Sequence, residues 1–353
     1  MDQPKVPRPS TAPYTRIATE EAFAPAEMIR IWKKILAGPD PDPGFASLMG
    51  FYMTSQADRP RHVMACLQEL GTMRLQHMDD AGIDRQVIAL TAPGVQVMDA
   101  ESGAAFARVA NDELAEACRK HPTRFSGMIA VAPHSPAEAA KEIERGVSKL
   151  GLSGVIINSH TQGEYLSDSK FWEIFEAAQA HDTPIYLHPN TPPRQMIRPF
   201  LDAGLDGAIF GFAVETGLHA LRLITAGVFD RFPRLQVILG HTGEALPFWS
   251  YRLDYMHQAT VGAKRYETMK PLKKRPSDYL RENFHITNSG VAWEPAIKLC
   301  QGVVGTDRVL YAMDYPYQYS IEEVHILDRM QMGPDVKKAF FQTNAEHLFK
   351  IPA

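Results

Sequence analysis

The sequence predicts an α/β protein built as a single (β/α)8 barrel. Eight short apolar runs, typical of buried parallel strands, alternate along the 353 residues with segments of helical periodicity. No change of composition and no internal repeat divides the chain, so eight alternating units indicate one closed parallel barrel. A doubly wound open sheet is the alternative. It would favour a glycine-rich phosphate turn after the first strand, where this chain has Glu20-Glu21-Ala22-Phe23.

The predicted elements follow one another in regular order. The strands are 16–19, 86–90, 125–131, 154–158, 184–188, 237–241, 284–287 and 309–314. The helices are 26–36, 61–81, 102–120, 136–150, 170–180, 194–205, 208–229, 244–258, 292–301, 321–330 and 335–349. Residues 1–15 contain four prolines and no apolar stretch, which predicts a flexible N-terminal arm before a catalytic domain of residues 16–353. Residues 38–60 form a long connection rich in Pro, Gly and Asp, and its apolar side chains favour a lid insertion.

Composition narrows the functional classes. An apolar fraction of 45% supplies a large core, and a formal net charge of -4 gives no reason to expect nucleic acid or an anionic membrane as partner. The three cysteines are far apart, so neither a disulfide framework nor a thiolate metal pair is indicated. No apolar run approaches the ~20 residues that span a bilayer. We therefore expect a soluble, cytoplasmic protein that acts on a small molecule.

A metal site is the main functional prediction. Four apolar runs end in groups that bind metals, namely Glu20 or Glu21, His188, His241 and Asp314. The carboxyl ends of the strands of a (β/α)8 barrel meet at one face, where active sites lie. A carboxylate at the end of a buried strand is costly unless it binds a metal, a proton or a cation. A single residue of this kind often has only a structural role, but four of them at the ends of different strands favour a shared metal site.

The ligand types indicate which metal. Glu20, His188 and Asp314 offer mostly oxygen donors, one imidazole and no thiolate. This set favours one Mn²⁺ ion, with Zn²⁺ as the alternative, and needs no organic cofactor. Consecutive strand residues point to opposite faces, so only one of Glu20 and Glu21 should point inward, and the residues alone leave open which. The other is then expected to be a surface or salt-bridged carboxylate.

The order of these residues resembles the amidohydrolase superfamily of TIM barrels. The resemblance rests on Glu at the first strand, His at the fifth, His-x-Gly-Glu at the sixth and Asp at the eighth. Within that superfamily the chain resembles the decarboxylase branch related to aminocarboxymuconate-semialdehyde decarboxylase. Four stretches, 17–23, 157–163, 207–212 and 311–319, resemble 5-carboxyvanillate decarboxylases of lignin catabolism.

Two departures from the wider superfamily affect the expected reaction. Hydrolytic members often carry His-x-His after the first strand, whereas this chain has Glu20-x-Ala22. Members with two metals need a carboxylated lysine at the fourth strand, which ends here at Asn158. Both changes favour one metal and weigh against a hydrolase with a bridging hydroxide.

The resemblance implies decarboxylation of a phenolic acid, with 5-carboxyvanillate giving vanillate and CO2. In this interpretation Asp314 donates the proton to the ring carbon, and His241, oriented by Glu244, hydrogen-bonds the substrate or Asp314. Arg59 and Arg252 are the candidate partners of the substrate carboxylates because guanidinium groups bind carboxylates in a bidentate manner. The expected contacts to the ring and phenol are Tyr52, Thr91 and Tyr317.

Two alternatives stay open at this level. A metal-dependent hydrolase of the lactonase type could use the same barrel, with His241 or Asp314 activating water. A catalytically inert barrel that serves as an assembly subunit is the other, because a fold alone does not prove activity. The resemblance also implies a homodimer or homotetramer, in which Arg252 could serve its own site or that of a neighbouring subunit.

Overall fold

A computed structural model describes residues 12–352 and contains one ring of parallel strands. The strands are β1 Ile17–Phe23, β2 Arg85–Leu90, β3 Phe125–Gly127, β4 Ile129–Ala130, β5 Val155–Asn158, β6 Ile185–His188, β7 Val237–Leu239, β8 Phe284–Thr287 and β9 Val309–Leu310. They pair in the orders β1-β2-β3 and β4-β5-β6-β7-β8-β9. β3 and β4 are the two halves of one predicted strand, interrupted at Met128.

Backbone hydrogen bonds join the two groups of strands into a barrel. Met128 N donates to Ile88 O and Ile129 N donates to Gly154 O, both at 2.8 Å, so the chain passes from the side of β2 to the side of β5 at this point. At the other junction, Thr19 N donates to Tyr311 O at 3.1 Å and Ala22 N donates to Tyr315 O at 2.7 Å. The predicted (β/α)8 architecture is confirmed.

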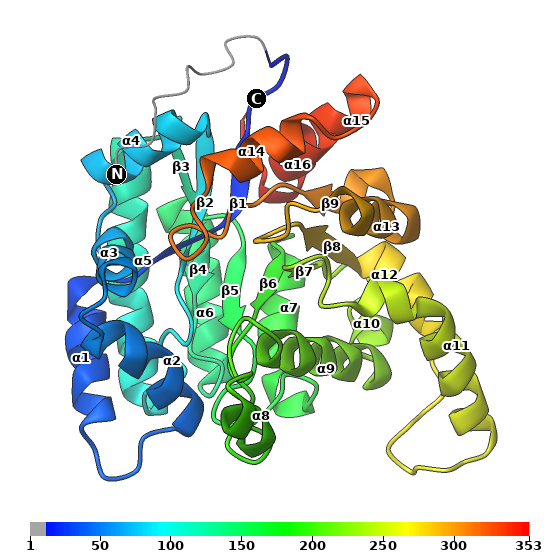
Figure 1. Ribbon diagram of the computed structural model, residues 1–353. Coiled ribbons are helices and arrows are strands. Elements are labelled where there is room, and N and C mark those ends of the chain that lie inside the picture. The colour runs from blue at the N-terminus through cyan, green and yellow to red at the C-terminus, as the bar shows by residue number, and fades with distance from the viewer. Residues whose placement is uncertain (1–11, 353) are drawn as a thin grey trace.

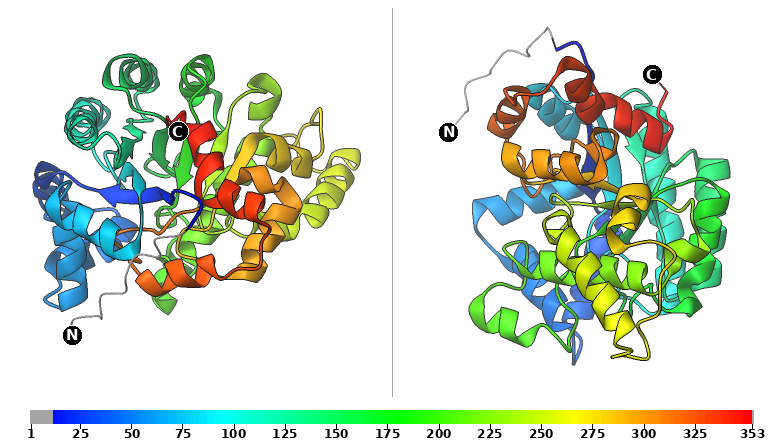
Figure 2. Two further views of the ribbon diagram at one scale, coloured as in Figure 1. Left: turned by 90° about the horizontal axis from the view of Figure 1, so that it is seen from above. Right: turned by 90° about the vertical axis from the view of Figure 1, so that its right-hand side faces the viewer.

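The helices lie outside the strands (Figures 1 and 2). They are α1 Ala26–Leu36, α2 Pro43–Thr54, α3 Asp58–Leu67, α4 Thr72–Ala81, α5 Ala100–Lys120, α6 Pro136–Arg145, α7 Trp172–Ala180, α8 Arg198–Ala203, α9 Gly211–Thr225, α10 Val228–Arg231, α11 Leu246–Gly262, α12 Pro276–Asn283, α13 Glu294–Val304, α14 Ile321–Asp328, α15 Pro334–Lys338 and α16 Asn344–Phe349. Short 3₁₀ and π turns extend some of them: η1 Gly146–Leu150, η2 Ser169–Phe171, η3 Thr306–Arg308 and η4 Ala339–Thr343. No helix in the described part of the chain is long and apolar enough to cross a membrane.

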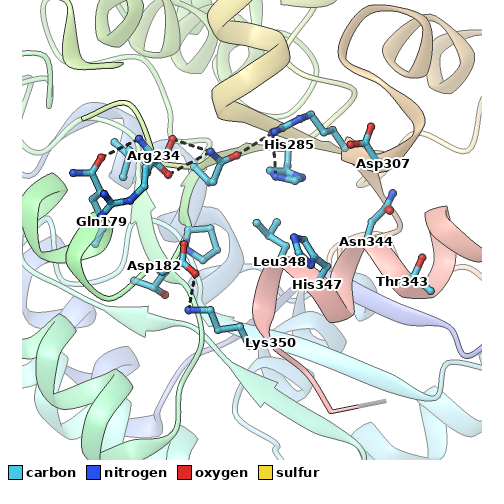
Figure 3. A pocket seen from close by; sticks show the side chains of 16 residues that line it. Gln179, Asp182, Arg234, His285, Asp307, Thr343, Asn344, His347, Leu348 and Lys350 are labelled. Carbon is cyan, nitrogen blue, oxygen red and sulfur yellow. Dashed lines mark hydrogen bonds and ion pairs between the residues drawn. The ribbon is translucent and has the colours of Figure 1, made fainter. Parts of the chain in front are cut away.

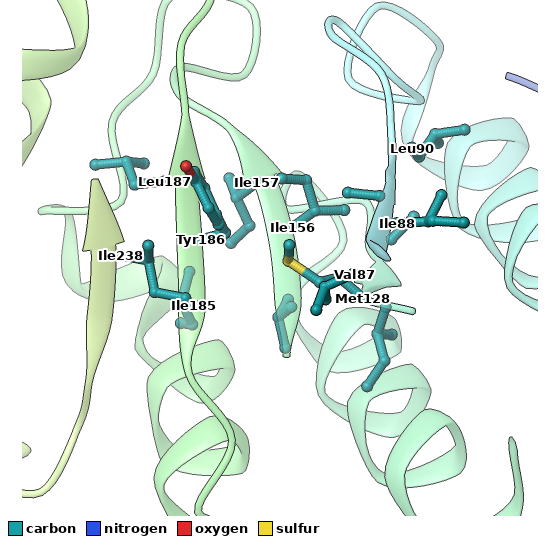
Figure 4. Close-up of a cluster of buried hydrophobic side chains, with 14 of the residues drawn as sticks. Val87, Ile88, Leu90, Met128, Ile156, Ile157, Ile185, Tyr186, Leu187 and Ile238 are labelled. Carbon is teal, nitrogen blue, oxygen red and sulfur yellow. The ribbon is translucent and has the colours of Figure 1, made fainter. Parts of the chain in front are cut away.

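Side chains of the strands fill the core as the apolar runs predict. Val87, Ile157, Ile185 and Leu187 are completely buried, and Figure 4 shows such side chains gathered on and between neighbouring strands. Burial on both faces is why these strands read as continuous apolar runs and not as alternating patterns.

The insertion at 38–60 is more ordered than the predicted connection. It contains α2, whose N-cap Asp42 accepts hydrogen bonds from Gly44 N and Phe45 N at 3.0 and 2.9 Å, with Pro43 in the first turn. A Cβ on Gly44 would lie 2.1 Å from Thr191 Oγ1, so the helix packs tightly on the loop after β6. Asp42-Pro43 is a typical start of a helix, but the neighbouring prolines and glycines made the segment resemble an irregular loop in the sequence.

Other predicted boundaries are corrected. The first strand continues to Phe23, and the helix expected over 208–229 is the two helices α9 and α10. The helix expected over 335–349 is α15, the turn η4 and α16. The helix expected over 61–81 is two helices, α3 and α4, separated by a turn that ends at Gly71. Helix α12 was not predicted and follows residues 264–275, which carry six Lys and Arg side chains.

The N-terminal arm predicted for 1–15 lies mostly outside the described residues. Within the described part, Tyr14 stacks on Phe341 with ring centroids 4.8 Å apart, and its hydroxyl donates to Asp328 Oδ1 at 2.9 Å. Asp328 also pairs with Arg16 at 2.7 Å. Tyr14, the penultimate residue of the predicted arm, is therefore packed against the domain.

Candidate active site

A β-bulge in β1 decides the direction of the two consecutive glutamates. Ala18 pairs with Gln86 and Glu21 with Ile88, so β1 contains one residue more than β2 across this interval. The extra residue disturbs the usual alternation of faces, and Glu20 and Glu21 are both buried, at 5% and 1% exposure. The expectation that one of them would be a surface or salt-bridged carboxylate is wrong, because Glu21 is buried and forms no ion pair within the described residues.

Glu20 points toward two strand-end histidines. Its Oε1 lies 3.4 Å from His188 Nε2 and 3.6 Å from His241 Nε2. Its Oε2 accepts hydrogen bonds from Tyr186 OH and, at 3.1 Å, from Thr287 Oγ1. The carboxylate therefore has one oxygen held by hydroxyls and the other directed at imidazole nitrogens.

A glycine makes room for this carboxylate. A Cβ on Gly240, at the end of β7, would lie 2.7 Å from Glu20 Oε2. Any larger residue would push Glu20 away, so the glycine before His241 has a packing function in the site.

Glu21 faces the opposite direction and holds the segment that carries Asp314. Its Oε1 accepts from Met313 N at 3.0 Å and its Oε2 accepts from Tyr315 N at 3.2 Å, the two amides that flank Asp314. Burial raises the pKa of Glu21 to about 8 despite these hydrogen bonds and the nearby Arg74. Asp314 itself adopts a left-handed backbone conformation with φ of 70°.

The tautomer of His188 suits a metal ligand. Its Nδ1 donates to Pro189 O at 2.8 Å, which leaves the Nε2 lone pair directed toward Glu20. Burial, with help from His241, lowers the pKa of His188 against the pull of the Glu20 carboxylate. The imidazole is therefore neutral, the form that coordinates metals.

His241 and Glu244 form a buried pair. His241 Nδ1 lies 2.9 Å from Glu244 Oε1 in a turn where both residues have positive φ, just before α11 begins. Burial alone would lower the pKa of His241, but the carboxylates of Glu20, Glu244 and Asp314 outweigh it and raise the pKa to about 10. Burial also raises the pKa of Glu244.

Asp314 belongs to the same electrostatic environment. Burial raises its pKa to about 8; Glu20 adds to this shift, while His241 and Arg59 oppose it. Asp314 is therefore close enough to Glu20 and His241 to interact with their charges.

The donor set fits a divalent metal. Glu20 Oε1 is buried and has no hydrogen-bond partner among the described residues. Its 3.4 Å distance to His188 Nε2 matches two ligands that share one ion, because bonds of about 2.1 Å place neighbouring ligand atoms roughly 3.0–3.4 Å apart. Glu20, His188 and Asp314 are the residues that would hold the ion, and the described cysteines are not in this site.

Four of the predicted substrate residues lie together beside Asp314. Tyr317 OH and Thr91 Oγ1 are 2.7 Å apart, and Arg59 donates to Tyr317 O at 2.9 Å. The rings of Tyr52 and Tyr317 make an edge contact with centroids 5.4 Å apart. Charges of Arg59 and Asp314 both act on Tyr52, whose pKa burial raises.

Arg252 lies elsewhere. It is exposed on α11 and forms no hydrogen bond or ion pair within the described part of the chain. Within one subunit it is therefore not part of the cluster around Asp314.

Two cavities are lined by residues other than those predicted for the site. One of about 460 Å³ is lined by residues 38–42 of the insertion and by Asn190, which follows β6, and it contains none of the predicted site residues. Another of about 890 Å³ lies among residues that precede β6, β7 and β9, including Asp182, Arg234 and Asp307 (Figure 3). The second cavity is at the amino ends of the strands and contains none of the predicted site residues.

The sequence analysis did not identify three residues that position the site. Glu21 holds the segment around Asp314, and Tyr186 and Thr287 hold Glu20. Tyr186 precedes His188 by two positions on β6, and residues two apart on a strand share a face. That spacing was a usable signal. No local signal connects Thr287 or Glu21 to their partners, because both contacts join distant parts of the chain.

Comparisons with known proteins agree with this geometry. The amidohydrolase family profile matches residues 54–351. Gamma-resorcylate decarboxylase from Polaromonas sp. is 34% identical over 293 residues, which cover 81% of this chain and 89% of that protein.

Solved structures are also similar. The structure of 5-carboxyvanillate decarboxylase from Novosphingobium aromaticivorans, with manganese and 4-hydroxy-3-methoxy-5-nitrobenzoic acid, is 54% identical and has a TM-score of 0.96 over 99% of this chain and all of that one. The corresponding enzyme from Sphingomonas paucimobilis is 39% identical, with a TM-score of 0.91 over 96% of this chain and 99% of that one. On the family match and these identities, the chain belongs to the amidohydrolase family.

Proposed function

We propose that this protein is a metal-dependent decarboxylase of phenolic aromatic acids, and that it converts 5-carboxyvanillate to vanillate and CO2. The observation that carries the proposal is Glu20 Oε1, a buried carboxylate oxygen that has no hydrogen-bond partner among the described residues and faces His188 Nε2. Asp314, which interacts electrostatically with Glu20 and with Arg59, connects this oxygen to the cluster of Tyr52, Tyr317 and Arg59. The similarity to decarboxylases of phenolic acids supports it, because one of them was solved with manganese and a nitro analogue of a hydroxy-methoxybenzoate.

Glu20, His188 and Asp314 hold one divalent ion in this proposal, Mn²⁺ by preference and Zn²⁺ as the alternative. When bound, the ion supplies positive charge for the phenol and carboxylate oxygens of the substrate. Tyr186 and Thr287 hold Glu20 in the orientation that the ion requires.

The cluster of Tyr52, Arg59, Thr91 and Tyr317 binds the remainder of the substrate. Arg59 uses one N–H for Tyr317 O and keeps other donors for a substrate carboxylate. Tyr52 and Tyr317 contact the ring, and the Thr91 and Tyr317 hydroxyls are placed for its polar substituents.

Asp314 moves the proton. A bound cation would favour the ionised form of Asp314, so the proton that Asp314 delivers to the ring carbon bearing the departing carboxylate would come from the substrate phenol. The bond from that carbon to the carboxylate then breaks, its electron pair restores the aromatic ring, and CO2 leaves. His241, held by Glu244, hydrogen-bonds the reacting groups.

The exposed face of α11 supports a homodimer or homotetramer. Phe248, Tyr251 and Tyr255 are 70%, 84% and 62% exposed along this helix, which stands at the edge of the molecule (Figure 1). Such an apolar face is typical of a subunit interface. Association there would bury Arg252 near a neighbouring chain, and sedimentation of wild type against Tyr251→Glu tests it. A monomeric wild type would refute this part of the proposal.

The decisive experiment follows CO2 release from 5-carboxyvanillate by Mn²⁺-loaded protein, with Asp314→Asn as the inactive control. Release by wild type alone would support both the reaction and the substrate. No release from folded, metal-loaded protein would refute the substrate. If the protein instead hydrolyses lactones in a parallel panel, the proposed decarboxylase activity would be refuted in favour of a hydrolase.

A further inference from the structure

A second group of metal-binding side chains lies outside the candidate active site, between α3 and α4. His62 and Cys66 are one turn apart on α3, so their side chains share a face of that helix, and His77 comes from α4. Their donor atoms all lie within 4.8 Å of one another. We refer to these residues as the His62–Cys66–His77 cluster.

The spacing suits a tetrahedral ion with a thiolate ligand. Cys66 Sγ lies 3.4 Å from His62 Nε2. Bonds of about 2.3 Å to sulfur and about 2.0 Å to nitrogen would place these atoms roughly 3.5 Å apart. The other separations between donor atoms are all within 4.8 Å and would shorten on binding through side-chain rotation, and His62 is exposed, so solvent reaches the site.

His77 is oriented as metal-binding histidines usually are. Its Nδ1 lies 2.9 Å from Tyr315 OH, and its ring stacks on Tyr319 with centroids 5.0 Å apart. Its Nε2 has no hydrogen-bond partner in the described residues. In the tautomer whose Nδ1–H donates to Tyr315, this hydrogen bond fixes the ring and leaves Nε2 free of a proton for the metal.

A simple hydrogen bond between Cys66 and His62 is the alternative explanation. Burial raises the pKa of Cys66, so without a cation the thiol is protonated and can donate to His62. Tyr315 extends this network, because its hydroxyl hydrogen-bonds both Cys66 and His77. A network of this kind alone would bind no cobalt, whereas the three convergent donors can also share one ion.

We propose that the His62–Cys66–His77 cluster is a second cation site, which takes Zn²⁺-like ions in preference to Mn²⁺. Thiolate and imidazole donors select zinc-class ions, whereas the oxygen-rich set of Glu20, His188 and Asp314 accepts Mn²⁺. Binding breaks the S–H bond of Cys66, forms a sulfur–metal bond and releases one proton to solvent. The site does not depend on the proposed decarboxylase function.

Co²⁺ distinguishes the two sites because only a thiolate ligand produces a sulfur-to-cobalt charge-transfer band. Mn²⁺-loaded protein is titrated with Co²⁺ in the near ultraviolet. We expect the band to appear in wild type at one Co²⁺ per chain and to be absent in Cys66→Ser. Cys300→Ser is the matched control, because Cys300 is equally buried but donates only to Thr242 O, and it should retain the band.

His62→Gln gives a test that does not disturb the core. This exposed residue can be replaced without loss of folding, and we expect at least a tenfold weaker Co²⁺ affinity with unchanged Mn²⁺ content. A wild type without the band, a band that persists in Cys66→Ser, or unchanged Co²⁺ affinity in His62→Gln would each overturn the proposal.

Discussion

Replacing Tyr186 by Phe tests whether Glu20 is held in place for a metal. Tyr186 is completely buried on β6, and its hydroxyl donates to Glu20 Oε2 while lying 3.0 Å from Thr287 Oγ1. Tyr186→Phe removes this donor without changing the ring, so the cavity and the packing stay almost the same.

The size of the effect follows from the number of donors. Loss of a residue that orients a metal ligand typically weakens metal binding 10–100-fold. Thr287 still donates to the same oxygen at 3.1 Å in this variant. We therefore expect a Mn²⁺ affinity about tenfold weaker than that of the wild type, which corresponds to about 1.4 kcal/mol of binding free energy. The metal-free protein should also lose about 1.5–3 kcal/mol of unfolding free energy, since a buried carboxylate loses a hydrogen bond.

Tyr311→Phe is the matched control. Tyr311 is equally buried, but its hydroxyl has no hydrogen-bond partner among the described residues. Its removal should leave Mn²⁺ affinity unchanged and should not lower stability, because no hydrogen bond is lost.

The assay is a Mn²⁺ titration followed by the electron paramagnetic resonance of free Mn²⁺, with urea unfolding in chelator as the second measurement. A Mn²⁺ affinity of Tyr186→Phe within twofold of the Tyr311→Phe value would refute the reasoning. It would mean that Glu20 either needs no support or does not bind the metal.

Three further predictions concern the role of Asp314 in the reaction, the role of Glu21 in holding the segment around Asp314, and the pH dependence of stability. Asp314→Asn should retain Mn²⁺ and 4-hydroxy-3-methoxy-5-nitrobenzoate in calorimetry but lose about 10²–10⁴-fold in kcat; near-normal turnover would remove Asp314 from the chemistry. At pH 9, where the carboxylate form of Glu21 prevails over its pKa of about 8, Glu21→Gln should destabilise the protein by about 1–3 kcal/mol in urea. The amide N–H₂ of Gln must then face one of the two backbone amides that the carboxylate binds, and unchanged stability would contradict that role. Burial lowers the pKa of His219 to about 3, whereas unfolded His titrates near 6.5. From about pH 6.5 down to 3 the unfolded state thus binds one more proton, and stability should fall by about 1.4 kcal/mol per pH unit from this residue. Urea unfolding between pH 7 and 4.5 should show a correspondingly smaller slope in His219→Gln, and equal slopes would exclude His219 as the source.

Much of the site could be predicted because barrel geometry converts strand ends into neighbours. His188, His241 and Asp314 are distant in sequence, yet each ends an apolar run, and parallel strands bring such ends to one face. Tyr52, Arg59, Thr91 and Tyr317 also lie together.

The sequence by itself determined the alternation of strands and helices, and with it the face on which the chemistry lies, because these follow from local apolar patterns. Only the tertiary structure decided between the consecutive glutamates. The bulge between Ala18 and Glu21 depends on how β1 pairs with β2, and this turns Glu20 to the histidines and Glu21 to the amides around Asp314. It also decided that Arg252 lies outside the site of its own subunit. Hydrogen-bond register and contacts between distant segments are properties of the folded chain, which local periodicity does not record.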